Sequence, residues 1–390
     1  MKILYLLPNK MDFERGVTGD IVQQWNIISR LGKRGHNIRL FAYEGLHDVV
    51  DISSEEALIL KKTWTNSIIF KIIARMIWRL QLLLRTPYLN CFSNIERYDA
   101  ISQVILDYDI VFERLALYKM GVALASKINH KPYVIFFDAD PIFELDYTGI
   151  PIKGLLRWNA RQMLKFSLAL ADRVICVSSV VSNQLITHYQ VEEKKIIVLP
   201  NAVDVQVIYP QNKSQSIINK LGIENNKVIM FVGSFCPWHD VTILIESFTM
   251  VLDRIPSARL VCVGDGEGKQ QCVDFVQSLG IGPQVIFTGN VPRSEMSMWM
   301  SVADIMVAPY PKMDVEFWGS PMKIFEYMAA GKPIIASAVG QLKAIIKNGW
   351  NGVLVEPGDV NSLSEKLIEL LSDEALATSL GYHARDNAVQ

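Results

Sequence analysis

One short segment brings together residues that can bind an anion and a sugar. Ser320 and Pro321 are typical of a helix start, because serine caps free N–H groups and proline fits the first helical position. The positive end of a helix dipole attracts phosphate, and Gly319 lets a diphosphate approach the backbone. Lys323 and Glu326 share one face, where an ammonium neutralises phosphate and a carboxylate accepts from ribose hydroxyls. Taken alone, this spacing is explained more simply by a surface ion pair.

Other polar residues follow expected strands, at the sheet edge where open α/β folds bind ligands. Asp138 and Asp140 come directly after the apolar run 133–137, and Asp138 is a candidate to orient an acceptor hydroxyl. Because loop aspartates are more often turn or cap residues, this role is only weakly preferred. Glu113 and Arg114 occupy a similar strand end, with a surface ion pair as the alternative.

Apolar segments separated by loops predict the elements that position these residues. In the first half we expect a helix ending at Lys33 and strands at 3–7, 38–43, 110–112, 133–137, 174–177 and 196–199. In the second half we expect helices from Asp240 and from Pro321, and strands at 227–232, 259–263, 285–288, 304–308 and 333–337. Strands alternating with helices favour parallel sheets, so the fold class is α/β with two similar halves. The polar stretch 212–219 is the expected hinge between them.

Length and composition limit the possible functions. A chain of 390 residues, 50% hydrophobic, is expected to form two domains. Its 39 basic residues balance 40 acidic ones, so no global field would hold nucleic acid. Five cysteines without CxxC spacing indicate reduced residues, and the first apolar run, which stops at Pro8, is too short for a signal peptide. No apolar stretch reaches the roughly 18 residues that span a bilayer, so a cytoplasmic protein is expected.

The segment 61–85 combines basic and large apolar residues. It contains six lysines and arginines and no acidic residue, with tryptophans at 64 and 78. Such a helix suits peripheral contact with the inner face of a membrane, through apolar burial and attraction to anionic lipid. A helix of the first domain with arginines extended along its surface is an equally favoured interpretation.

Several segments resemble, in chain order, the motifs of glycosyltransferase family 4. They are 171–178, 200–204, 263–266, 287–292, 317–333, Gly340-Gln341 and 351–359. The resemblance covers nearly the whole chain and implies a GT-B fold, with two Rossmann-like domains facing each other across a cleft. It divides the chain into an acceptor-binding domain 1–205, a nucleotide-sugar-binding domain 206–372 and a helical tail 373–390. Members usually continue into a helix that crosses back to the first domain, so the tail is expected to be truncated.

The resemblance also implies roles for single residues. Glu326 matches the second glutamate of the family's Glu, seven residues, Glu motif and would bind the donor ribose, as part of the catalytic set with Lys323, Asp138 and His239. The first glutamate is replaced by Trp318, and Glu316 is the nearby carboxylate that can take its place. Arginine and lysine usually follow the Gly233 position, where this chain has Ser234 and His239. The phosphate charge would then fall to Lys323, with His239 assisting if protonated, although a core histidine is the alternative.

The remaining donor and acceptor contacts are expected from loops. Gly264, Gly266 and Val291 lie in segments that resemble nucleotide-facing loops of the family. Gly16 and Gly19 resemble the glycine loop that lets donor phosphate and acceptor approach the first helix, with an ordinary turn as the alternative.

The resemblance implies a retaining glycosyltransferase that uses a nucleotide diphosphate sugar without metal or other cofactor. The acceptor would be a glycan, a lipid-linked sugar or a small molecule, in polysaccharide or glycoconjugate biosynthesis. The alternatives are a nucleotide-sugar epimerase of similar fold and a non-catalytic homologue. A nicotinamide-dependent dehydrogenase is disfavoured, because no intact G-x-G-x-x-G follows the first strand.

Overall fold

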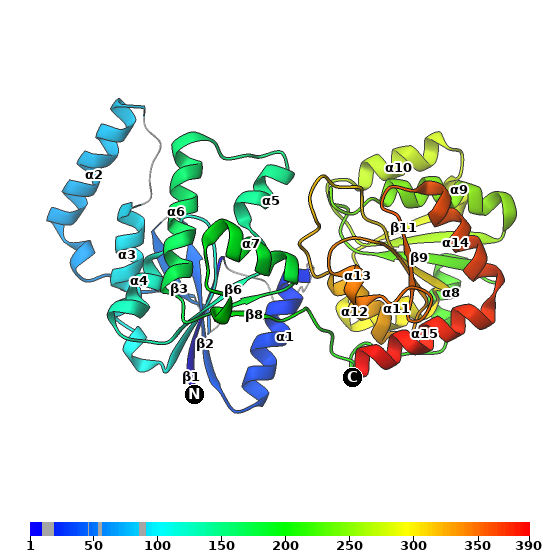
Figure 1. The fold of residues 1–390 in the computed structure, drawn as a ribbon, viewed down its shortest axis with the longest axis horizontal. Helices are drawn as coiled ribbons and strands as arrows, with labels where there is room; N and C mark the ends of the chain where they lie inside the picture. Colours follow the sequence, from blue (N-terminus) through cyan, green and yellow to red (C-terminus); the bar gives the residue numbers. More distant parts are fainter. Residues whose placement is uncertain (10–18, 46, 54–56, 86–90) are drawn as a thin grey trace. The chain divides into compact units, whose positions relative to one another are not determined.

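The computed structural model describes residues 1–9, 19–45, 47–53, 57–85 and 91–390. These residues form two compact units, the first within 1–9 and 27–200 and the second within 19–26 and 201–390. The first unit is built on a mainly parallel sheet and the second on a wholly parallel sheet. Helices connect the strands in both, as the sequence predicts (Figure 1).

The first unit contains an eight-stranded sheet in the order β4-β3-β2-β1-β5-β6-β7-β8. Its strands are β1 (Lys2–Leu7), β2 (Asn37–Glu44), β3 (Asp48–Asp51), β4 (Leu58–Ile59), β5 (Ile110–Arg114), β6 (Tyr133–Phe137), β7 (Arg173–Cys176) and β8 (Ile196–Val198). The short edge strands β3 and β4 pair antiparallel, and the others pair in parallel. In the central strand β1, residues 3–7 are all buried, as expected where helices cover both faces of a parallel sheet.

The helices of this part of the chain connect successive strands. They are α1 (Gly19–Lys33), η1 (Trp64–Asn66), α2 (Ile68–Leu83), α3 (Cys91–Ser102), η2 (Ile105–Asp107), α4 (Gly121–Ile128), α5 (Pro141–Tyr147), α6 (Gly154–Leu170), α7 (Ser179–Tyr189) and η3 (Glu193–Lys195). Among the described residues, no helix is both long enough and apolar enough to cross a bilayer.

The second unit contains a six-stranded parallel sheet in the order β11-β10-β9-β12-β13-β14. Its strands are β9 (Lys227–Val232), β10 (Ala258–Val263), β11 (Val285–Gly289), β12 (Ile305–Ala308), β13 (Ile334–Ser337) and β14 (Val353–Val355). Its helices are α8 (Gln215–Leu221), α9 (Val241–Arg254), α10 (Lys269–Ser278), η4 (Gly282–Gln284), η5 (Arg293–Glu295), α11 (Met296–Ser301), α12 (Met322–Ala329), α13 (Leu342–Ile345), α14 (Val360–Ser372) and α15 (Glu374–Val389).

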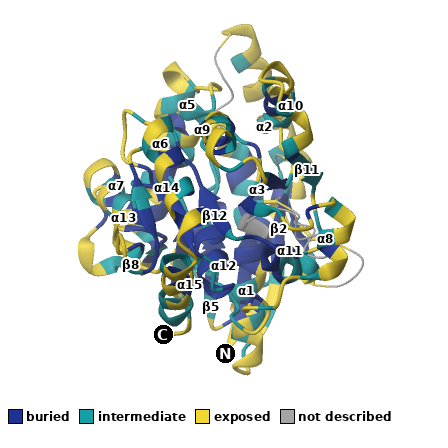
Figure 2. Cartoon of the chain, turned by 90° about the vertical axis from the view of Figure 1, so that its right-hand side faces the viewer, coloured by how far each residue is buried: buried dark blue, intermediate teal, exposed yellow. Residues whose placement is uncertain are grey.

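Side chains of this second sheet alternate between two hydrophobic cores. In β9, Val228, Met230 and Val232 belong to one core, and Ile229 and Phe231 belong to the other. This division follows from the period of two residues along a strand. The central strand β12 is drawn as buried along its length (Figure 2). Helices α12 and α9 therefore pack on opposite faces of one sheet.

The structure corrects the expected hinge at 212–219. Residues 215–221 form helix α8 inside the second unit, and Ile217 is buried in its core. The polarity of this stretch reflects one exposed helix face and not a connection between units.

Candidate donor-binding site

The loops after β9 and β10 pack so closely that the loop after β10 requires glycine at two positions. A Cβ at Gly264, whose φ is +130°, would lie 2.1 Å from the Gly233 carbonyl oxygen. A Cβ at Gly266 would lie 2.7 Å from the backbone of Phe235, whose N–H donates to the Asp265 carbonyl. The predicted site residues Gly233, Gly264 and Gly266 are thus brought together, and backbone packing alone already requires glycine at 264 and 266.

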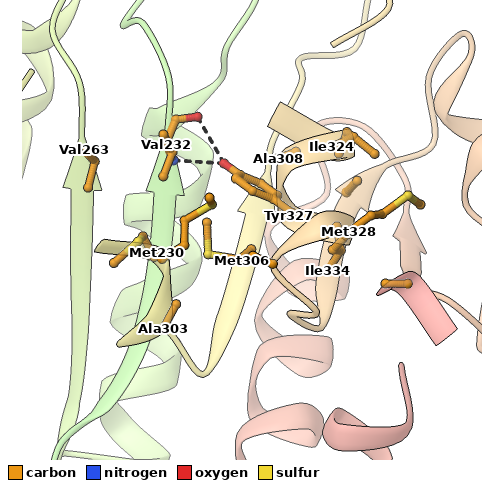
Figure 3. Packing of buried hydrophobic residues seen from close by; sticks show 14 of the residues in the cluster. Met230, Val232, Val263, Ala303, Met306, Ala308, Ile324, Tyr327, Met328 and Ile334 are labelled. Atoms are coloured by element: carbon orange, nitrogen blue, oxygen red, sulfur yellow. Dashed lines mark hydrogen bonds between the residues drawn. The ribbon is translucent and has the colours of Figure 1, made fainter. Parts of the chain in front are cut away.

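Helix α12 is fixed against the end of β9 by Tyr327. The Tyr327 hydroxyl accepts from the Val232 N–H at 2.9 Å and donates to the Val232 carbonyl at 3.1 Å (Figure 3). These backbone groups are open to it because β12 pairs with β9 only as far as Met230. Gly233 directly follows Val232, so the first turn of α12 lies beside the loop after β9.

The start of α12 differs from its prediction. The helix begins at Met322, and the Pro321 position before it provides no side-chain cap. Ser320, the predicted N-cap, is buried and bonds elsewhere, since its Oγ accepts from the Asn201 N–H at 3.0 Å. The first N–H groups of α12 therefore lack a side-chain cap, which is the condition for anion binding at a helix start.

Lys323 is the most unusual residue of the site. Its side chain is 7% exposed, and its Nζ has no hydrogen-bond partner among the described groups. The ammonium lies 4.3 Å from the ring centroid of Phe231 and 5.8 Å from that of Tyr310. Burial lowers the pKa of Lys323 to about 7, because the charged form loses its hydration. A Cβ at Gly233 would lie 2.7 Å from this Nζ, so the glycine leaves the space that the ammonium occupies.

The structure corrects the expected role of His239 as an assisting cation. Its Nδ1–H donates to the Ser234 carbonyl at 2.7 Å, and Nδ1 lies 3.1 Å from the Cys236 sulfur. Burial and the nearby Lys323 charge hold the pKa of His239 well below its usual value, so the neutral ring is favoured. His239 stabilises the loop after β9 through its bond to the Ser234 carbonyl. The Ser234 side chain is exposed, and its hydroxyl donates to the Cys236 sulfur.

Glu326 is held by an arginine that sequence reasoning missed. The Arg293 guanidinium donates to Glu326 Oε1 at 2.7 Å, and the glutamate side chain is 9% exposed. Lys323 and Glu326 are both buried, which excludes the surface ion pair considered for their spacing. Arg293 directly follows the predicted Val291-Pro292 loop, and Val291 itself packs against the core. The loop after β11 thus reaches the same helix as the loop after β9.

The aromatic segment before α12 belongs to the core. Trp318 is 5% exposed and lies against Phe317, whose ring packs on Tyr310 with centroids 4.8 Å apart. A Cβ at Gly319 would meet the Phe317 ring at 2.6 Å, and one at Gly340 would meet the Phe317 carbonyl oxygen at 2.1 Å. Trp318 therefore supports the loop that leads into α12, which is a packing role.

Glu316, the predicted substitute for the missing glutamate, is engaged with its neighbours. Lys343 Nζ lies 2.7 Å from Glu316 Oε1, and the Gly340 N–H donates to the same atom at 3.0 Å. The hydrogen bond from Lys343 holds the pKa of this carboxyl below its usual value. Glu316 is half-exposed, so these partners orient it without removing it from solvent.

In the first unit, the predicted aspartates have different surroundings. Asp140 caps α5 through the Ile142 N–H at 2.9 Å and accepts from the Tyr189 hydroxyl at 2.8 Å, so it is structural. Asp138 forms an ion pair with Arg114 at the ends of β6 and β5, where it remains partly exposed. Among the described residues, no group of His, Cys, Asp and Glu could hold a metal ion. Gly19 begins α1, and Gly16 lies outside the described residues.

Glu113 is more deeply buried than its sequence position suggested. It is fully buried and accepts from the hydroxyls of Tyr43 and Tyr133, which come from β2 and β6. Burial raises the pKa of Glu113 to about 7. The surface pair with Arg114 is therefore wrong, because Arg114 bonds Asp138 instead. The burial and raised pKa of Glu113 come from packing against β2 and β6, which lie far from β5 in the sequence.

Family models match both halves of the chain. The model described as Glycosyltransferase Family 4 matches residues 22–207, and that described as Glycosyl transferases group 1 matches residues 213–387. Among curated relatives, an N-acetyl-alpha-D-glucosaminyl L-malate synthase of Bacillus anthracis is 27% identical over 234 residues. That match covers 60% of this chain and 58% of the relative, so the chain spans somewhat more than half of that relative's length.

Solved structures share the fold over the whole chain. Anabaena HepE, determined in complex with UDP-glucose, has a TM-score of 0.66 and 18% identity, over 100% of this chain and 95% of its own. A glycosyltransferase from Rickettsia africae has a TM-score of 0.68 and 18% identity, over 100% and 93% of the two chains. Both share the arrangement of two parallel-sheet α/β units of the GT-B fold, as the sequence predicts.

Proposed function

The chain belongs to glycosyltransferase family 4, and on this premise we propose that it transfers a hexosyl-type sugar from a nucleotide diphosphate sugar to an acceptor. We propose that the anomeric configuration is retained, as in the family. The observation that carries the proposal is the buried ammonium of Lys323, which has no hydrogen-bond partner among the described residues and lies beside Gly233 and the start of α12.

A diphosphate would compensate the burial of Lys323. An ammonium without a hydrogen-bond partner is unfavourable in a protein interior, whereas a bound anion restores its interactions. In the proposed reaction Lys323 and the first N–H groups of α12 receive the negative charge that develops on the leaving diphosphate. The route needs no metal ion, because the helix start and the ammonium together supply the positive field.

Glu326 is proposed to bind the donor ribose. Its carboxylate lies one turn further along α12 than Lys323 and is oriented by Arg293. A ribose hydroxyl that donates to this carboxylate would add to or replace the arginine contact. Asp138 remains the proposed acceptor-side residue, because it stands at a strand end and is partly exposed.

The proposed acceptor is a carbohydrate or a lipid-linked sugar, in the biosynthesis of a polysaccharide or glycoconjugate. We propose that the protein acts in the cytoplasm, in peripheral contact with the inner face of a membrane. Helix α2 supports this part of the proposal, because its apolar and basic side chains are exposed.

A donor screen tests the proposed reaction. The purified protein is incubated with UDP, GDP and ADP sugars while nucleotide release is followed, beginning with UDP-glucose because HepE was solved with that compound. Release that Glu326→Ala abolishes and Glu365→Ala leaves intact would support the site, since Glu365 is an exposed residue of α14. A new free sugar isomer would indicate an epimerase, and absence of both release and calorimetric binding would indicate a non-catalytic homologue.

A further inference from the structure

Helix α2 is joined firmly to the first unit at its base. The buried carboxylate of Asp99 accepts four hydrogen bonds, from the N–H and hydroxyl groups of Thr63 and Thr65, at 2.6–3.0 Å. Ser67 caps the helix through the Phe70 N–H. Phe70 also packs edge-on against Trp64, with ring centroids 5.6 Å apart. The start of α2 is therefore fixed by specific contacts.

Beyond this base, α2 buries none of its own side chains. All 16 residues, Ile68–Leu83, remain at least partly exposed, and Figure 1 draws the helix standing out from the sheet of its unit. The less exposed positions Phe70, Ala74 and Gln81 recur at the spacing of one helix face. On this face the Phe70 ring packs against Phe92 of α3, with centroids 5.8 Å apart, and the opposite face is more exposed.

The uncovered face carries both apolar and cationic side chains. Ile68, Ile72, Arg75, Arg79 and Leu83 recur at intervals of three or four residues and therefore share one side of the helix. Ile68 is 77% exposed and Leu83 is 79% exposed, and together with their exposed neighbours they form a contiguous apolar patch of the kind that marks an interaction surface. One isoleucine, one methionine and two leucines flank the stripe and are exposed by 50% or more, at 69, 76, 80 and 82.

We propose that α2 lies flat on an anionic lipid surface, with the stripe of Ile68, Ile72, Arg75, Arg79 and Leu83 facing the lipid. The apolar side chains enter the boundary between headgroups and acyl chains, while the arginines contact lipid phosphates. A helix of 16 residues is about 24 Å long, which suits an in-plane position. The proposal deepens the membrane contact named under the proposed function and rests on that part of it. It holds whichever donor and acceptor the protein uses.

Charge decides between lipid and a second copy of the chain as the occupant of this face. The segment 61–85 contains six basic residues and no acidic one. In a two-fold symmetric contact the same patch would face itself, and like charges would repel. An anionic bilayer complements the charge and also buries the apolar residues, so lipid satisfies both features and a second copy of the chain does not.

Vesicle binding tests this inference. The protein is sedimented with phosphatidylcholine vesicles that contain or lack phosphatidylglycerol, and we expect strong binding only where the anionic lipid is present. Each basic residue near such a surface strengthens binding about fivefold, so Arg75→Glu with Arg79→Glu should weaken it by more than roughly tenfold. Lys33→Glu with Lys127→Glu is the matched control, because both lysines are exposed on α1 and α4 and the charge change is equal.

A second pair of variants tests the apolar contribution. Ile72→Ser with Met76→Ser should weaken vesicle binding, while Leu106→Ser with Ile128→Ser, also exposed, should not. Unchanged melting transitions would show that all variants fold. Equal binding to neutral vesicles, unchanged binding of the arginine variant, or lipid-independent dimers that this variant dissociates would each overturn the inference. The vesicle assay contains no donor, so a negative result there would not count against the transfer reaction. A negative donor screen would likewise not count against lipid binding.

Discussion

Replacing Lys323 by methionine should stabilise the second unit and abolish donor binding. Methionine keeps most of the unbranched side chain but removes a buried charge that has no hydrogen-bond partner among the described groups. The pKa of Lys323 falls from 10.5 to about 7 on folding. At about 1.4 kcal/mol per pKa unit, the buried amine lowers stability near pH 7 by roughly 4 kcal/mol relative to an unperturbed lysine.

The sign of the pH dependence follows from the direction of this shift. Between pH 7 and pH 10.5 the unfolded chain binds more protons at this lysine than the folded chain, so its contribution to stability rises with pH. From pH 7 to pH 9 the wild-type protein should gain about 2 kcal/mol from this group, and Lys323→Met should lack that gain. Urea denaturation at both pH values, followed by a probe in the second unit, measures the difference.

Lys332 provides a matched control for this experiment. Its partly buried Nζ donates to the carbonyls of Ser301 and Ala303 at 2.7 and 2.8 Å. Burial lowers the pKa of Lys332 as well, to about 8, so Lys332→Met should also lose part of the pH dependence of stability. Donor binding, measured by calorimetry with the nucleotide diphosphate, should be kept, and this separates the two lysines. The reasoning is refuted if Lys323→Met binds donor normally, or if its stability advantage over wild type is the same at pH 9 as at pH 7.

Three further predictions concern groups whose surroundings are unusual. Gly264→Ala should destabilise the second unit by more than about 2 kcal/mol, whereas Gly280→Ala, at φ +70° but with nothing within 4 Å, should cost about 1 kcal/mol, as thermal melting can check. The raised pKa of Glu113, about 7, stabilises its protonated form, so wild-type stability should fall between pH 4.5 and pH 7; Glu113→Gln should flatten this fall, and parallel curves would contradict it. Arg293→Ala leaves the buried Glu326 carboxylate without its ion-pair partner and should lower stability by about 3 kcal/mol in urea denaturation, a figure that an exposed pair would not approach.

Much of the fold could be predicted from the sequence, because the central strands are apolar runs that end in glycine or proline. The strands β1, β9 and β12 were all predicted within a residue or so of their bounds. The edge strands β3 and β4 were missed, since segments of four and two residues carry too little periodicity. The sequence predicts a hinge in place of helix α8, because the exposed polar face of this helix outweighs the single buried Ile217.

The site was predictable where its chemistry is local in sequence. Lys323 and Gly233 follow from the helix start and the strand end, and the structure brings them together. Arg293 and the tyrosine partners of Glu113 could not be found in this way, because these contacts join residues 33 and at least 20 positions apart on different elements. Ser320 shows the opposite error, in which a good local cap residue bonds the distant Asn201 instead.

The departures of this chain from the family pattern are consistent with one physical arrangement. Ser234 and neutral His239 leave the loop after β9 without a cation, and this loop packs against α12, where Lys323 supplies one. Gly233 has no Cβ, so the ammonium can occupy the space beside the loop, and the Phe231 ring supports its charge from one side. Because the same burial that destabilises the ammonium also excludes water, its attraction to a diphosphate is stronger there than at the surface. The instability of Lys323 in the folded protein and its proposed contribution to donor binding thus have a single cause.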